Sequence, residues 1–221
     1  YDSAMRFLRD GDAVIIDLED AVAPDDKTGA RAALVEWLPK APRRVLVRVN
    51  AAGTEWFDAD LRGCAAAPNV DGLLVPKAER ASDLHSVAAA CPGTPIYPLI
   101  ETAHGLWDVL PIAQASGVRA LLFGSIDFQA DLGILDDDLL YARSQLVVAS
   151  RVAGIAPPID GVTQAIDDAE LLRRDAYRAR HLGFAGKACI HPAQVDIVNA
   201  CFAPTADEVE SETRVTLLPA T

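Results

Sequence analysis

One apolar run of this chain reads Pro95-Ile96-Tyr97-Pro98-Leu99-Ile100-Glu101-Thr102, and a second reads Ala120-Leu121-Leu122-Phe123-Gly124-Ser125-Ile126-Asp127-Phe128. Both runs are continuous, as is typical of strands that are covered on both faces, and both lead into a carboxylate. A carboxylate at the end of a buried strand is unfavourable unless a cation or a hydrogen-bond network compensates its charge. We therefore expect Glu101 and Asp127 to share one partner.

Similar apolar runs recur along the chain at intervals of roughly 25 to 35 residues, which is the length of a βα unit. Helix-like stretches lie between them, and this alternation predicts a parallel sheet covered by helices. The further predicted strands are Asp12–Leu18, Arg44–Val49, Asp71–Pro76, Ile155–Ile159 and Gly186–Ile190. The predicted helices are Lys27–Leu38, Ala81–Ala90, Gly105–Ser116, Asp138–Ala153 and Asp167–Leu182.

The fold that we expect is a TIM-type (β/α)8 barrel whose first strand is absent from this sequence. Seven strands are visible, and the chain opens with a helix-like stretch, Tyr1–Arg9. An open doubly wound sheet fits the alternation too, but no G-x-G-x-x-G or P-loop follows any predicted strand, so the barrel is favoured. We expect one barrel domain over residues 1–204 and a divergent C-terminal tail over residues 205–221.

Composition narrows the possible partners. The chain has 221 residues, of which 51% are hydrophobic, and a net charge of -12. Such an acidic chain is unsuited to nucleic acid or an anionic membrane surface as its main partner. No apolar run approaches the roughly 20 residues that span a bilayer. The four cysteines show no C-x-x-C spacing, which predicts reduced thiols in a cytoplasmic protein.

The chemistry of the carboxylate pair indicates a magnesium site. Catalytic groups of a barrel lie at the carboxyl ends of its strands. Mg²⁺ typically takes one or two protein carboxylates and leaves its other positions to water and substrate oxygens. Glu101 and Asp127 are the predicted ligands; alternatively, each caps the following helix or pairs with an arginine. Asp131 is expected at a helix start or beside a ligand.

Arg48 is the predicted substrate-binding and catalytic cation. It ends a strong strand, and a guanidinium there can hold a substrate carboxylate in a two-pronged contact. The alternative is a buried ion pair with Glu19 or Asp20, and both contacts can exist together.

Glu19 and Lys77 complete the candidate site. Glu19 lies in an acidic strand end with Asp17 and Asp20, where like charges repel unless a cation is near. We expect it either to support the catalytic site or to cap the helix after Pro24. Lys77 is interpreted as a contact for an anionic acyl carrier, with an ordinary surface lysine as the alternative.

With these motifs in place, the chain resembles the citrate lyase beta-subunit-like branch of the HpcH/HpaI aldolase/citrate lyase family. The matching segments keep the order of the family and cover the chain up to about Pro204. They are Gly11–Val22, Arg48-Val49-Asn50, Val75-Pro76-Lys77, Leu99–Thr102, Gly124–Phe128 with Asp131-Leu132-Gly133, and Gly186–Pro192. The family's first strand and C-terminal segment have no counterpart here, so the resemblance identifies no general acid or base.

The resemblance implies a barrel that is usually trimeric and uses Mg²⁺, with Glu101 and Asp127 as ligands and Arg48 on the substrate carboxylate. Members of the family cleave or form carbon–carbon bonds in citryl, malyl or citramalyl thioesters of coenzyme A or acyl carrier protein. Such a reaction needs hydrogen-bond donors for the thioester enolate, and Gly124 and Ser125 are the candidates.

Three functions follow from these expectations. The leading one is a Mg²⁺-dependent lyase that acts on a small β-hydroxy diacid thioester and releases an oxo acid such as oxaloacetate. The second is a metal-dependent aldolase that uses a free 2-oxo acid. The third is a non-catalytic subunit that binds metal and oxo acid without turnover.

Overall fold

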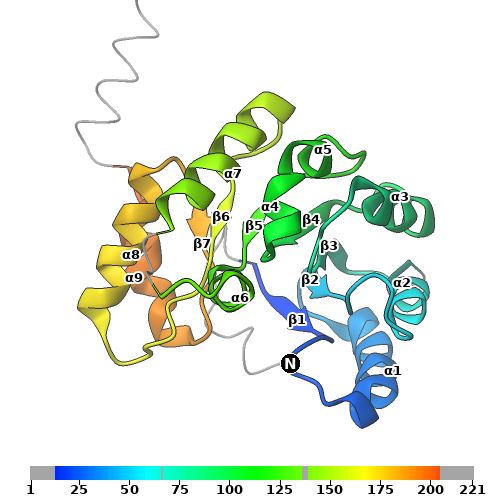
Figure 1. Ribbon diagram of the computed structural model, residues 1–221. Coiled ribbons are helices and arrows are strands. Elements are labelled where there is room, and N and C mark those ends of the chain that lie inside the picture. The colour runs from blue at the N-terminus through cyan, green and yellow to red at the C-terminus, as the bar shows by residue number, and fades with distance from the viewer. Residues whose placement is uncertain (1–12, 66, 136–138, 205–221) are drawn as a thin grey trace, which may run out of the picture.

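The computed structural model describes residues 13–65, 67–135 and 139–204, and these contain a curled sheet of seven parallel strands (Figure 1). Each strand pairs with its neighbour in chain order, β1 with β2 through to β6 with β7. No pair joins β7 to β1 within the described residues. The strands are β1 (Ile15–Asp17), β2 (Val45–Arg48), β3 (Val70–Val75), β4 (Ile96–Ile100), β5 (Leu122–Phe123), β6 (Ile159–Asp160) and β7 (Gly186–Lys187).

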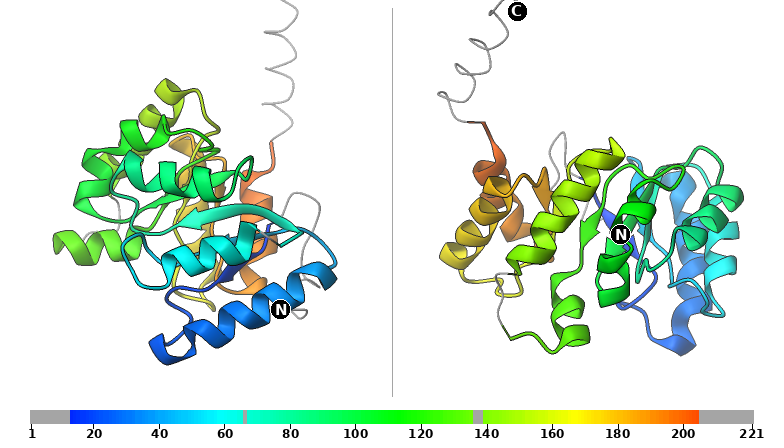
Figure 2. Two further views of the ribbon diagram at one scale, coloured as in Figure 1. Left: turned by 90° about the vertical axis from the view of Figure 1, so that its right-hand side faces the viewer. Right: turned by 45° about the horizontal axis from the view of Figure 1, so that its top comes forward.

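Most helices lie on the outside of the curled sheet in chain order, from α1 beside β1 and β2 to α8 and α9 beside β7, whereas α6 lies in front of the middle of the sheet in Figure 1 (Figures 1 and 2). Two 3-10 turns, Pro24–Asp26 and Leu38–Lys40, flank the first helix. The helices are α1 (Lys27–Trp37), α2 (Phe57–Ala65), α3 (Ala81–Ala90), α4 (Ala103–Trp107), α5 (Val109–Ala113), α6 (Ser125–Leu132), α7 (Leu140–Ala153), α8 (Ala169–His181) and α9 (Pro192–Phe202). This βα order confirms the expected barrel-type fold.

Two separate apolar layers explain why the strands are apolar on both faces. A small inner cluster consists of Leu46, Leu74, Leu99 and Leu122, with Tyr97 and Ile159 packed against it. A much larger outer cluster lies between the strands and the helices and includes Val45, Val47, Leu73, Val75 and Phe123. Successive strand residues therefore alternate between the two layers, as the period of a strand requires.

The predicted helix Gly105–Ser116 is wrong in one respect, because the structure has two short helices there, α4 and α5. Pro111 is the physical reason. It has no N–H to donate to the carbonyl of Trp107, so a continuous helix is disfavoured. The chain turns at Asp108, and Pro111 then falls in the first turn of α5, where a missing N–H costs little.

The predicted boundaries of the strands and helices agree with the structure to within a few residues, but three helices were not predicted. These are α2, α6 and α9. Two other predictions, the opening helix Tyr1–Arg9 and the tail 205–221, lie outside the described residues.

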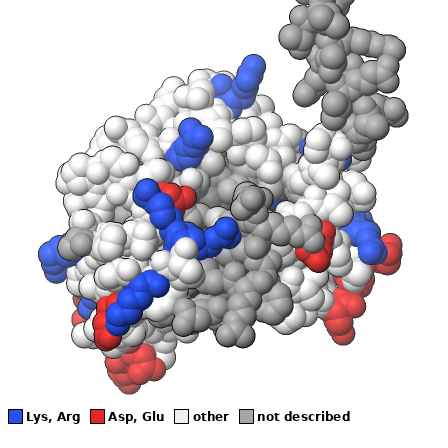
Figure 3. Space-filling view, turned by 180° about the vertical axis from the view of Figure 1, so that it is seen from behind, with Lys and Arg blue, Asp and Glu red and all other residues white. Residues whose placement is uncertain are grey.

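No helix in the described part of the chain is long and apolar enough to cross a membrane. Figure 3 shows the face opposite to that of Figure 1, where several Lys and Arg side chains lie toward the middle, while others, with most of the Asp and Glu side chains, lie toward the margins.

Candidate active site

The inner face of the curled sheet brings the predicted site residues to one end. Because side chains alternate along a strand, Arg48 lies two residues beyond the inner Leu46, and Glu101 two residues beyond the inner Leu99. Both positions are at or just past the carboxyl end of their strand. The site therefore lies where catalytic groups of barrels are found.

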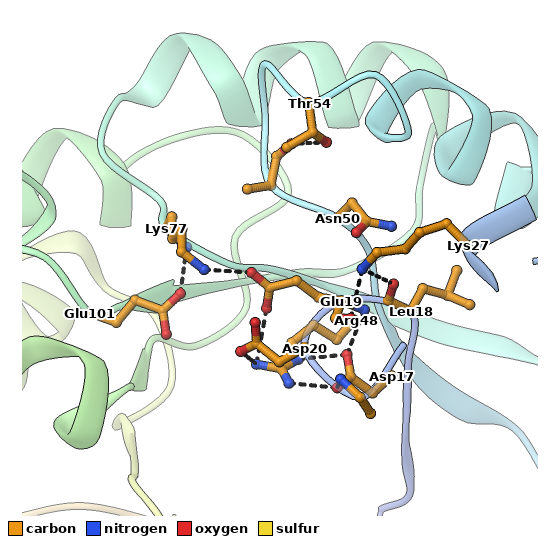
Figure 4. Close-up of polar contacts among 12 residues, drawn as sticks. Asp17, Leu18, Glu19, Asp20, Lys27, Arg48, Asn50, Thr54, Lys77 and Glu101 are labelled. Carbon is orange, nitrogen blue, oxygen red and sulfur yellow. Dashed lines mark hydrogen bonds and ion pairs between the residues drawn. The ribbon is translucent and has the colours of Figure 1, made fainter. Parts of the chain in front are cut away.

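Arg48 is surrounded by three carboxylates (Figure 4). Its Nε and Nη2 donate to the two oxygens of Asp17 at 2.8 and 2.6 Å. Its Nη1 lies 3.1 Å from Glu19 Oε2 and 3.4 Å from Asp20 Oδ2. The alternative interpretation of Arg48, an ion pair with Glu19 or Asp20, is thus present in the structure, with Asp17 as an additional and closer partner.

Glu19, Lys77 and Glu101 form a continuous polar chain from β1 to β4. Lys77 Nζ donates to Glu19 Oε1 at 2.6 Å, and the Lys77 backbone N–H donates to Glu101 Oε1 at 2.8 Å. Lys77 adopts a left-handed backbone conformation with φ of 48°. This turn lets one residue contact both carboxylates, one through its side chain and one through its backbone.

Glu101 is the most strongly perturbed acid of the site. It is 2% exposed, and burial raises its pKa to about 8, with the charges of Glu19 and Asp127 adding to the rise and Lys77 opposing it. It does not cap the following helix, because Thr102 does so by accepting from the Gly105 N–H at 3.0 Å. Burial thus disfavours the ionised form of Glu101, and a bound cation would stabilise that form.

Gly124 explains how the Glu101 carboxylate fits against the next strand. A Cβ at Gly124 would lie 2.5 Å from Glu101 Cβ and 2.6 Å from Glu101 Oε2, so only glycine leaves room for this side chain. The Gly124 N–H already donates to the Ile100 carbonyl at 2.9 Å. Gly124 therefore contributes space for Glu101, and not a hydrogen-bond donor for the substrate. The buried Ser125 begins α6, where the first N–H groups lack intrahelical acceptors.

The donor set fits Mg²⁺. Asp127 lies in the first turn of α6 and is near enough to Glu101 for its charge to raise the pKa of that carboxyl. Among the described residues no three or more His, Cys, Asp or Glu side chains form a group able to hold a metal. Two carboxylates with the remaining positions left to water and substrate oxygens is the arrangement that Mg²⁺ commonly accepts.

Asp131 was predicted at a helix start or beside a ligand. The first alternative is wrong, because Asp131 lies near the end of α6. Its Oδ2 accepts from the Ala103 N–H at 2.7 Å and so joins α6 to the beginning of α4. This contact holds together the two segments that carry Asp127 and Glu101.

The sequence analysis missed several buried polar residues behind the site. Lys27 donates to the carbonyl oxygens of Leu18 and Glu19 at 2.9 and 2.6 Å. Asp60 accepts from Asn50 and from Arg31. Lys27 and Arg31 stand four residues apart in a predicted helix, which places them on one face, but nothing in the sequence showed that this face is turned inward.

Comparison with known proteins identifies the family of the chain. Residues 5–192 match the HpcH/HpaI aldolase/citrate lyase family. The chain is 40% identical over 210 residues to a (3S)-malyl-CoA thioesterase of Cereibacter sphaeroides, covering 92% of this chain and 73% of that protein. It is 38% identical to a citrate lyase subunit beta-like protein of Deinococcus radiodurans, covering 88% of this chain and 72% of the relative.

The solved structures include protein CitE from Mycobacterium tuberculosis in complex with magnesium, acetoacetate and coenzyme A. It matches with a TM-score of 0.83 at 31% identity, covering 98% of this chain and 80% of that one. The fold and the family that the sequence motifs predicted are both confirmed. The chain belongs to the HpcH/HpaI aldolase/citrate lyase family.

Proposed function

We propose that this protein is a Mg²⁺-dependent carbon–carbon lyase that acts on a small β-hydroxy diacid thioester of the malyl, citramalyl or citryl type. One observation carries the proposal: the buried Glu101 carboxylate, with Asp127 beside it, opens on the same end of the barrel as the Arg48 guanidinium. Such a site suits a substrate that has a carboxylate and a neighbouring hydroxyl or keto oxygen. The guanidinium would bind the carboxylate, and a metal ion held by the carboxylate pair would bind the oxygen. CitE, crystallised with magnesium, acetoacetate and coenzyme A, supports both the metal and the thioester carrier.

Glu101 and Asp127 are the residues that would hold the metal ion. When bound, Mg²⁺ would act as a Lewis acid on the hydroxyl or keto oxygen of the oxo-acid half of the substrate. Gly124 leaves room for Glu101 at this position, and the Lys77 N–H fixes one of the two Glu101 oxygens.

Arg48 binds the substrate carboxylate in this proposal. Asp17 occupies Nε and Nη2 and fixes the plane of the guanidinium, while Nη1 faces Glu19 and Asp20. Asp20 is the most distant of the three acids at 3.4 Å, and its side chain is 58% exposed. A substrate carboxylate therefore replaces Asp20 on Nη1 at the least cost, because that pair is long and already hydrated.

Glu19 is the proposed proton-accepting group. It is 6% exposed, and burial raises its pKa above the ordinary value, although Lys77 and Arg48 act in the opposite direction. A carboxylate with a raised pKa is a better general base near neutral pH than a surface glutamate. Lys77 holds Glu19 in place and presents a positive charge to the thioester half, and the Ser125 N–H is the proposed donor to the enolate oxygen.

The cleavage of malyl-CoA shows which bond breaks and where the proton goes. The hydroxyl proton passes to Glu19 as the C2–C3 bond breaks, which yields glyoxylate and the enolate of acetyl-CoA. The proton held by Glu19 then passes to the enolate carbon, which gives acetyl-CoA and restores the Glu19 carboxylate. The thioester bond survives, and no free thiol is formed.

Hydrolysis of a malyl thioester is the second candidate, and the 40% identity to a (3S)-malyl-CoA thioesterase favours it. In that reaction water attacks the thioester carbonyl, and malate and free coenzyme A leave. The two reactions share no product, because the lyase gives glyoxylate and acetyl-CoA whereas hydrolysis gives malate and a free thiol.

A homotrimer, expected from the resemblance, is also proposed. Exposed apolar side chains on neighbouring helices support self-association: Trp107 at the end of α4 is 85% exposed and Tyr141 in α7 is 71% exposed. Light scattering coupled to size-exclusion chromatography would test it, and a monomeric mass would contradict it.

The function is tested by incubating the purified protein with malyl-, citramalyl- and citryl-CoA, with Mg²⁺ and with chelator, and separating the products. Formation of an oxo acid and a shorter thioester supports the lyase. Formation of free thiol with the carbon–carbon bond intact supports hydrolysis. Asp127→Asn should lower Mg²⁺-dependent turnover by roughly 100-fold or more. Asp108→Asn, which changes an exposed acid whose side chain accepts no cap hydrogen bond, should have a much smaller effect. Turnover of a free 2-oxo acid alone, or no turnover of any substrate, would favour the aldolase or the non-catalytic subunit.

A further inference from the structure

Lys27 is a buried lysine that the proposed reaction does not use. It begins α1, is 7% exposed, and its Nζ donates to the Leu18 and Glu19 carbonyl oxygens at 2.9 and 2.6 Å (Figure 4). The ammonium also lies 5.3 Å from the centre of the Trp56 ring. An ammonium is costly to bury unless its partners compensate it, and here the two carbonyl oxygens and the Trp56 ring do so.

The two carbonyls belong to the loop that leaves β1 and carries all three acids around Arg48. Glu19 is held from both sides: its carbonyl by Lys27, and its carboxylate by Lys77 at 2.6 Å and Arg48 at 3.1 Å. The same loop is fastened to β2, because the Leu18 N–H donates to the Arg48 carbonyl at 2.9 Å. Displacement of residues 18 and 19 would therefore move both Glu19 and the surroundings of Arg48.

From these contacts we infer that Lys27 is a positioning residue: it fixes the loop Asp17–Asp20 from behind and, through Glu19 and Arg48, sets the geometry of the oxo-acid site. The inference rests on the proposed function where it names an oxo acid as the ligand. The part that says that Lys27 fixes the loop Asp17–Asp20 does not depend on that function. Lys27 contacts neither Glu101 nor Asp127 in the described part of the chain and reaches Glu101 only through Glu19 and Lys77, so its main effect falls on the oxo acid and a smaller one on the metal.

The test compares Lys27→Met, Lys27→Gln and Lys27→Arg with Lys40→Met. Lys40 is a matched control, because its side chain is 69% exposed and its ion pair is with Glu36 on the surface. Calorimetry measures Mg²⁺ affinity and then oxaloacetate affinity in the presence of Mg²⁺. We expect Lys27→Met to lose roughly 10-fold in oxaloacetate affinity, because the Glu19 and Arg48 side chains that face the oxo acid would shift, and to change its Mg²⁺ affinity much less. Lys27→Arg, which keeps the charge, should recover part of the loss, and Lys40→Met should bind both as the unchanged protein does.

Amide hydrogen exchange separates this inference from the proposed function. In Lys27→Met the amides of residues 18–22 should lose protection, while the amides between β3 and β4, such as Leu73, keep theirs. If the unchanged protein binds Mg²⁺ but no oxaloacetate, the proposed function fails, and the exchange pattern still decides the role of Lys27. Unchanged protection at residues 18–22, or an equal loss throughout the chain, would overturn the inference. Should Lys27→Met not fold, the same comparison is made with Lys27→Gln.

Discussion

Asp17 and Arg48 are register partners in the adjacent parallel strands β1 and β2, and their side chains form a two-pronged ion pair at 2.6 and 2.8 Å. Each residue ends its strand, so the pair stands at the rim of the barrel, where an arginine would otherwise be free to turn. Asp17 also accepts from the Glu19 and Ala21 backbone N–H groups. One carboxylate thus orients both the guanidinium and the acidic loop.

The Asp17–Arg48 pair should make stability depend on pH in acid. Burial alone would raise the pKa of Asp17, but the hydrogen bond and charge of Arg48 together with two backbone N–H groups lower it below its ordinary value of 3.8. A lowered carboxyl pKa contributes stability above pH 3.8 that is lost as the pH falls through the folded-state value. Asp17→Asn should therefore cost about 2 kcal/mol at pH 7 and less at pH 3.

Urea unfolding of the two proteins at pH 3, 5 and 7 measures this difference. Asp20→Asn is the matched control, since its side chain is 58% exposed and 3.4 Å from Arg48, and its effect should be small at every pH. A constant difference between Asp17→Asn and the unchanged protein from pH 3 to pH 7 would contradict the assigned role of the ion pair.

Glu101 should couple metal binding to a proton. Its pKa of about 8, raised by burial, means that the carboxyl is largely protonated at pH 7 in the metal-free protein. Mg²⁺ binds the ionised form, so binding at pH 7 should release roughly one proton, and affinity should rise with pH until about 8. Calorimetry in two buffers of different ionisation enthalpy measures the proton directly. Binding without proton release would mean that Glu101 is not a ligand.

The same shift should make Glu101 unfavourable for folding without metal. A carboxyl with a raised pKa destabilises the folded state above its unfolded value of 4.5, and the cost grows until the pH reaches about 8. Glu101→Gln should thus raise the melting temperature of the metal-free protein at pH 8, have little effect at pH 4, and abolish stabilisation by Mg²⁺. A lower melting temperature at both pH values would show that Glu101 serves the fold and not the metal.

Gly124 should not tolerate a methyl group. In Gly124→Ala the new Cβ would meet Glu101 Cβ at 2.5 Å, so the Glu101 side chain or the strand end must move. We expect a loss of roughly 1–3 kcal/mol of stability and a marked loss of Mg²⁺ affinity. Gly29→Ala is the control, because nothing lies within 4 Å of that Cβ in α1, and alanine there should stabilise the helix by about 0.5–1 kcal/mol. Equal Mg²⁺ affinity in the two variants would contradict the steric argument.

Much of the site could be predicted because parallel strands bring their carboxyl ends to one edge. Arg48 and Glu101 each follow an apolar run, and the period of two along a strand placed them on the inner face. The contact between Lys77 and Glu101 could not be predicted, because it depends on the left-handed turn at Lys77. Such a turn is usually predicted from a glycine, and this position is a lysine. The direction of the Lys77 side chain toward Glu19 follows from the same turn.

Two of the three missed helices, α6 and α2, have physical reasons as well. The apolar run that ends at Phe128 contains both β5 and the first turn of α6, so Ser125, Ile126 and Phe128 resembled an extension of the strand. In α2 the buried face includes the charged residue Asp60, which interrupts the apolar period of that helix. The burial of Asp60 could not be predicted from the sequence, because it depends on its contacts with Arg31 and Asn50 in the folded chain.

Asp60 should therefore be one of the most sensitive charged positions in the chain. It is 1% exposed, its Oδ1 pairs with Arg31 at 2.8 Å, and its Oδ2 accepts from the backbone and the side-chain amide of Asn50 at 3.0 and 2.6 Å. Asp60→Leu leaves the Arg31 charge and the Asn50 amide without these partners, and removing one member of a buried pair typically costs about 3–5 kcal/mol. Because Asn50 follows Arg48 by two residues, oxo-acid affinity should fall together with stability. Asp58→Leu, at an exposed position of the same helix, should change the urea midpoint little, and an equal shift in both variants would show that Asp60 does not hold the end of β2.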